Sequence, residues 1–157
     1  MFIVFHCDKD DTHAMCDLTM VRADTWRGPF SRVNDRIWSS SGVSPHPEDP
    51  FFWLRASASG AISWHVILHN TPRGIHLFSE DGLSFALQQS LGDGGEPLGP
   101  FVFNETVVQA GAPPFTAQRR ERPWLLFEQG TSRPRALVTS MQASVHPVVF
   151  THAQAVA

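Results

Sequence analysis

Twelve prolines and eleven glycines divide this chain of 157 residues into short segments, and this punctuation argues against long helices. The segments between them are rich in β-branched and aromatic residues, and helical periodicity is hard to find. In "SEDGLSF", residues 79–85, Asp81 and Gly82 form a strong turn signal between two apolar runs. The pattern predicts an all-β protein of the sandwich, barrel or propeller kind. The candidate strands span residues 1–6, 18–23, 51–55, 62–69, 74–79, 83–88, 123–128 and 135–141, with a further candidate at 145–150.

The charge of the chain gives no reason to expect nucleic acid or an anionic membrane as a partner. The net charge is -3, and eleven of the twelve basic residues are arginines scattered along the chain, except around 119–122. An apolar content of 42% and a charged content of 17% fit one globular domain. No apolar stretch approaches the roughly 20 residues of a membrane helix, and no signal peptide is recognised, so the location stays open.

Cys7 and Cys16 are the only cysteines. Because His6, His13 and Asp17 lie nearby, a metal site is one alternative, although the spacing matches no common zinc pattern. We prefer two buried or partly buried thiols, and a disulfide stays open.

An internal repeat is the most informative pattern. A shift of 72 residues places Asp49 on Glu121 and "WHVILH" (64–69) on "ALVTSM" (136–141). Each copy then consists of an acid, an aromatic and apolar strand, a polar turn and a second strand. The interval exceeds a blade of about 40–50 residues, so the Gly/Pro-rich residues 91–118 serve as a long connection. Chance similarity between short β segments is the alternative.

Five boxes occur in an order that resembles the glycosidase-like five-bladed β-propellers, similar to glycoside hydrolase family 43 and its relatives. They are "ADTWRGPF" (23–30), "EDPFFW" (48–53), "WHVILHN" (64–70), "HLFSEDGLSF" (76–85) and "RRERPWLLFE" (119–128). The resemblance implies a partial propeller of about two and a half blades, each a four-stranded antiparallel sheet. Residues 1–38 would end the first blade, 48–90 form the second, 91–118 connect, and 119–150 start the third.

In that family, acids at the entrance of three innermost strands perform the chemistry. The resemblance implies that Asp49 orients and tunes the site and that Glu121 is the general acid. The strand that would carry the general-base Asp has no counterpart, so the expected chain begins after it. General-base assistance is typically worth about 10²–10⁴-fold, so we expect residues 1–157 alone to be a weak or inactive glycosidase.

Each acid has a plainer interpretation. Asp49 is also typical of a turn or cap aspartate, and Glu48 is an alternative partner in the site. Glu121 is also typical of a Glu–Arg ion pair that closes a blade. Strand alternation predicts that Arg120 and Arg122 point away from Glu121.

Further pocket residues are expected around the two acids. The candidate substrate-binding residues are Glu48, Trp53, His69, His76, Arg120 and Trp124. Aromatic residues in strands are more often core, and histidines are more often structural. Asp24 and Asp81 are interpreted as turn formers.

The sequence therefore predicts a glycoside hydrolase-like protein that acts on or binds a carbohydrate in a central pocket. No cofactor and no metal are implied. The alternatives are a non-catalytic carbohydrate-binding protein and an interaction protein that assembles, as a homo-oligomer, through exposed blade faces.

Overall fold

A computed structural model describes most of the chain. The described residues are 1–5, 8–9, 14–15, 18–38, 48–70, 73–88, 90–91, 97–99, 101–103, 106–107, 111, 113–143 and 149–155. Every regular element among them is a β-strand and every pairing is antiparallel, which confirms the all-β prediction. Cys7, Cys16, His6, His13 and Asp17 lie outside the described residues. Within the described part, no helix is long and apolar enough to cross a membrane.

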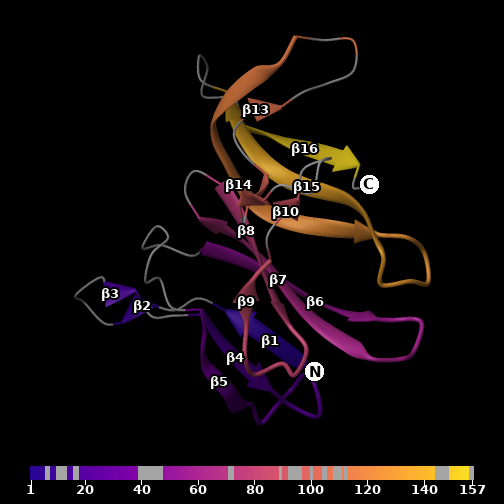
Figure 1. Cartoon of the computed structure of the whole chain (residues 1–157). Coiled ribbons are helices and arrows are strands. Elements are labelled where there is room, and N and C mark those ends of the chain that lie inside the picture. Colours follow the sequence, from indigo (N-terminus) through magenta and orange to yellow (C-terminus); the bar gives the residue numbers. More distant parts are fainter. Residues whose placement is uncertain are drawn as a thin grey trace.

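Three main sheets follow one another along the molecule (Figure 1). The first contains β1 (Phe2–Phe5), β4 (Leu18–Arg22) and β5 (Ser31–Trp38) in the order β1-β4-β5. A two-stranded ribbon of β2 (Asp8–Lys9) and β3 (Ala14–Met15) projects beside it.

The middle sheet is a meander of β6 (Glu48–Ala56), β7 (Ile62–Asn70) and β8 (Arg73–Ser79). Its outer position is shared: β9 (Ala86–Leu87) pairs with one end of β8, and β12 (Phe101–Phe103) pairs with the other. The strand expected at 83–88 is thus only two residues long. The expected connection at 91–118 contributes an outer strand to the sheet.

The third sheet has the order β13-β14-β15-β16, with β13 (Thr106–Val107), β14 (Phe115–Phe127), β15 (Pro134–Ala143) and β16 (Val149–Ala155). β14 begins eight residues before the strand predicted at 123–128, so the R-E-R-P box lies inside a strand instead of in front of one. A short pair of β10 (Ser90–Leu91) and β11 (Pro97–Gly99) lies in sequence between β9 and β12.

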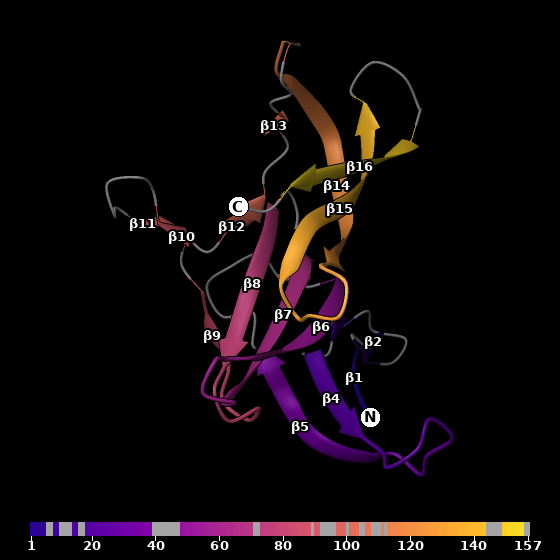
Figure 2. The same ribbon diagram turned by 90° about the vertical axis from the view of Figure 1, so that its right-hand side faces the viewer.

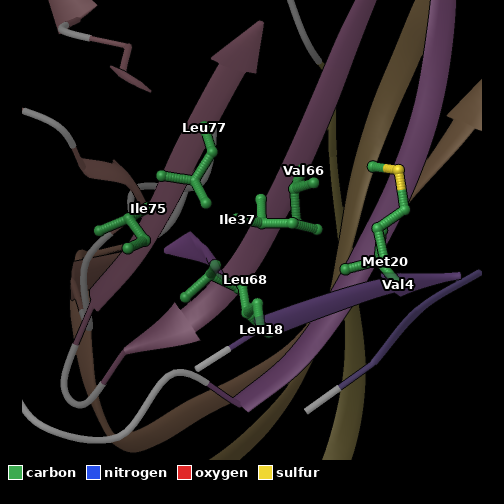
Figure 3. Packing of buried hydrophobic residues seen from close by; sticks show 8 residues of the cluster. All are labelled: Val4, Leu18, Met20, Ile37, Val66, Leu68, Ile75 and Leu77. Carbon is green, nitrogen blue, oxygen red and sulfur yellow. The ribbon is translucent and has the colours of Figure 1, made fainter. Parts of the chain in front are cut away.

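The middle sheet lies between the first and third sheets (Figure 2), and its alternating side chains contribute to two different cores. Val66 and Leu68 of β7 pack with residues of β1, β4, β5 and β8 in the first core, whose eight buried side chains appear in Figure 3. Ile67, between them, faces the other way and packs with Leu125 and Leu137 of the third sheet. β7 is therefore the central strand of the molecule.

The turn after β8 forms as its sequence predicts. The Asp81 carboxylate accepts hydrogen bonds from the backbone N–H groups of Leu83 (2.7 Å) and Ser84 (2.8 Å) and from the Ser79 hydroxyl (2.9 Å). These bonds stabilise the ionised form and lower the pKa of Asp81. Gly82 has a φ of 73°, which glycine adopts without steric cost. It also lies against the Trp64 ring, and a Cβ atom at this position would come within 2.7 Å of that ring.

Candidate functional site

A β-bulge positions the acids at the start of β6. Glu48 pairs with His69 and Phe51 pairs with Ile67, so a step of three residues on β6 opposes a step of two on β7. The extra residue is accommodated at Asp49, whose φ is 51°, and Pro50 follows it. Aspartate tolerates this left-handed conformation better than most residues.

The same bulge recurs in β14. Glu121 pairs with Ser140 and Trp124 pairs with Val138, again three residues against two. Here Arg122 has a φ of 53°, and Pro123 follows it. Both β6 and β14 thus contain the sequence Glu-x-Pro-aromatic, with the residue between Glu and Pro at positive φ.

This equivalence corrects the repeat register. Between β6 and β14 the shift is 73 residues and places Glu48, not Asp49, on Glu121, so the 72-residue alignment is wrong by one position there. Across the hairpin, the partner of Glu48 is His69 and the partner of Glu121 is Ser140.

Glu48, Asp49 and His69 converge at the first bulge. Their ligand atoms all lie within 4.8 Å of one another. The His69 side chain is only 2% exposed, and its Nδ1 is 3.6 Å from Oε2 of Glu48, whose side chain is 41% exposed. Asp49 is exposed. Because the bulge interrupts the alternation of side chains, two successive carboxylates approach the same imidazole.

Glu121 borders a cavity of about 200 Å³ formed by the third sheet. Its side chain is 16% exposed and forms an ion pair with Arg119. Trp124, two residues beyond Arg122, is 44% exposed. The residues around this cavity are Arg119, Glu121, Arg122, Ser140, Met141, Gln142 and Val149, so neither Glu48 nor Asp49 borders it.

The two arginines beside Glu121 behave differently from each other. Arg120 points away from the cavity, as strand alternation predicts, and is 2% exposed. Its guanidinium donates hydrogen bonds to Thr139 Oγ1 and Gln154 Oε1, at 3.1 Å each. Its Cζ atom lies 4.9 Å from the centre of the Phe103 ring. Burial lowers its pKa. Arg122 was expected to point away too, but this prediction is wrong, because at the bulge Arg122 borders the same cavity as Glu121.

A second group of side chains occupies the face of the middle sheet that also carries Ile67. Trp53 stacks on His65 (4.8 Å between ring centres) and on His76 (5.3 Å). His65 Nδ1 lies 2.9 Å from His76 Nε2, and His65 Nε2 lies 2.8 Å from the Ser63 hydroxyl. The predicted residues Trp53 and His76 are therefore packed together. His65 and Ser63 were not predicted, although their spacing of two residues on a strand places them on one face.

These histidines are held neutral. Burial, followed by the charge of Arg55, lowers the pKa of His65 to about 4. Burial, followed by His65 itself, lowers the pKa of His76 to about 4. Both border an open groove of about 970 Å³, whose lining includes the charged Arg55 and Glu80 and the aromatic ring of Phe78.

The eight candidate residues thus fall into four places. Glu48, Asp49 and His69 meet at the first bulge, and Glu121 lies at the second with Trp124 nearby. Trp53 and His76 stack with His65, and Arg120 is enclosed on the far side of β14. Comparison of the chain with protein-family models, with curated proteins and with solved structures found no match.

Proposed function

We propose that this protein binds a carbohydrate through the carboxylates of its two bulges and that its sheets are blades of a glycosidase-like propeller. The observation that carries the proposal is the repeated Glu-x-Pro-aromatic bulge, which presents Glu48 with Asp49 in one sheet and Glu121 in another. Carboxylates and arginines beside half-exposed aromatic rings are groups that can bind sugar hydroxyls and sugar ring faces.

The order of the strands supports this assignment. The chain enters the middle sheet at β6 and proceeds outward through β7 and β8, and it proceeds in the same way through β14, β15 and β16. This is the meander of a propeller blade. The short β13 beside the first residues of β14 departs from a plain four-stranded blade.

Binding is favoured over hydrolysis for residues 1–157. A general acid must deliver a proton to the leaving oxygen, and a second carboxylate must activate water or attack. Glu121 is ion-paired with Arg119, an arrangement suited to a carboxylate that accepts hydrogen bonds. We therefore assign Glu121 and Asp49 first to sugar recognition, with residual glycosidase activity as a secondary property.

A glycan panel tests the proposal. The wild-type protein is screened against immobilised oligosaccharides, and the best glycan is then titrated by calorimetry against Asp49→Asn and Glu121→Gln. Both variants should weaken binding at least about tenfold, which corresponds to about 1.4 kcal/mol. Glu128→Gln, an equivalent charge change in the turn after β14, should bind as the wild type does. Absence of any bound glycan, or full binding by both site variants, would contradict the proposal.

A further inference from the structure

His69 carries a buried nitrogen without a hydrogen-bond partner. Its side chain is 2% exposed, and Nδ1 makes no hydrogen bond. The facing Oε2 of Glu48 is 3.6 Å away, beyond the 2.7–3.2 Å typical of N–H···O bonds. Because nearly all buried polar atoms have partners, an unpartnered imidazole nitrogen aimed at a carboxylate indicates that a ligand belongs between them.

The surrounding groups have the chemistry of metal ligands. Asp49 joins Glu48 and His69, with all three ligand atoms within 4.8 Å of one another. A cation about 2.0–2.6 Å from each ligand can bridge the 3.6 Å between Nδ1 and Oε2. Asp49 is exposed, so a side-chain rotation can bring its carboxylate onto the same ion.

We propose that Glu48, Asp49 and His69 form a binding site for a divalent metal ion of the first transition row. Two carboxylates balance the charge of the ion, and an imidazole nitrogen favours a transition metal over Ca²⁺ or Mg²⁺, which prefer oxygen ligands. Three protein ligands at a partly exposed position leave coordination sites open for water or for ligand oxygens.

The second bulge provides an internal comparison. The positions equivalent to Glu48, Asp49 and His69 carry Glu121, Arg122 and Ser140. There a guanidinium replaces one carboxylate and a hydroxyl replaces the imidazole, so the same backbone geometry presents a site that repels cations. Metal binding is therefore a property of the first bulge, set by side chains at two positions.

This inference goes beyond the proposed function, because the metal site requires no sugar and is tested without one. Mn²⁺ is the probe, since it suits carboxylate and imidazole ligands and avoids the soft thiolates of Cys7 and Cys16. The paramagnetic resonance signal of free aqueous Mn²⁺ disappears on binding, so its loss during titration gives both stoichiometry and affinity.

The wild-type protein should bind one Mn²⁺ per chain. Glu48→Gln and Asp49→Asn should each weaken binding at least about tenfold, since even outer-shell changes at metal sites cost about 10–100-fold. His69→Gln should do the same, and thermal melts will show whether this buried variant still folds. Glu128→Gln is the matched control and should bind Mn²⁺ as the wild type does.

Three results would overturn the metal site. The first is no loss of the free Mn²⁺ signal, and the second is undiminished Mn²⁺ binding by either carboxylate variant. The third is displacement of Mn²⁺ by equimolar Ca²⁺, which would remove His69 from the ligand set. Loss of sugar binding in Asp49→Asn with full Mn²⁺ binding would leave the proposed function intact while contradicting this inference.

Discussion

Arg122 adopts a φ of 53°, a conformation that costs an L-residue with a Cβ atom about 1–2 kcal/mol. Asp49 has a φ of 51° at the equivalent position, where an aspartate fits better. Arg122 borders the Glu121 cavity at the bulge. The bulge thus places a strained residue beside that cavity, and the strain can be tested directly.

Arg122→Gly should raise the free energy of unfolding by about 0.5–1 kcal/mol, because glycine occupies positive φ without a steric penalty. Arg122→Val should lower it by more than about 1 kcal/mol, because a β-branched residue is an outlier there. Urea denaturation of the two variants measures both changes. A glycine variant less stable than the valine variant would show that this bulge is not formed.

His65 and His76 give the fold a dependence on pH. In the unfolded chain their pKa is about 6.5, whereas in the fold each is lowered to about 4. As the pH falls from about 6.5 to about 4, the two histidines are protonated in the unfolded state but stay neutral in the folded state. The free energy of unfolding should therefore fall between about pH 6.5 and pH 4.

Chemical denaturation at several pH values will measure this loss, and His76→Gln should make it shallower because one of the two groups no longer titrates. A variant with a slope as steep as the wild type's would exclude this pair as the cause. Because both groups border the open groove, the effect should be smaller than for fully buried histidines.

At the scale of the elements, β8 and β12 meet through a glycine and an aromatic ring. Gly74 of β8 pairs with Phe103, and a Cβ atom at residue 74 would overlap the Phe103 ring. β12 is therefore held as an outer strand by an aromatic side chain that covers a glycine.

Gly74→Ala should destabilise the protein by about 1–3 kcal/mol, as overpacking in a core does. In a Phe103→Leu background the same change should cost less, because the smaller side chain leaves room for the new methyl group. Thermal or urea denaturation of the wild type, the two single variants and the double variant completes this double-mutant cycle. An equal cost in both backgrounds would contradict the contact.

The strands show what sequence reasoning can and cannot predict. Alternation and turn residues located the apolar runs of β6, β7 and β8. The acids were expected at the start of strands, which holds for Glu48 but not for Glu121, because Glu121 lies inside β14. The bulges were not predicted, because neither Asp49 nor Arg122 is a glycine and no local signal separates an E-x-P bulge from a regular strand start. That omission explains both the register error of one residue and the wrong orientation of Arg122.

At the scale of the whole molecule, the middle sheet joins the other two, since its two faces contribute to separate cores. The side-chain partnership of His65 and His76 depends on the register of β7 against β8, in which His65 lies opposite Phe78 and diagonal to His76. A single sequence does not specify that register. The candidate site likewise depends on which sheets pack together, and hydrophobic pattern alone does not determine this packing.

The central claim is that the two bulges contact one carbohydrate, and a double-mutant cycle tests it most directly. The glycan with the highest affinity is titrated by calorimetry against the wild type, Asp49→Asn, Glu121→Gln and the double variant. If both carboxylates bind one sugar, the losses of binding free energy in the two single variants should not add up to the loss in the double variant. The coupling energy should exceed about 0.5 kcal/mol. Losses that simply add, or a loss caused by only one of the two variants, would place the acids at separate sites and contradict the claim.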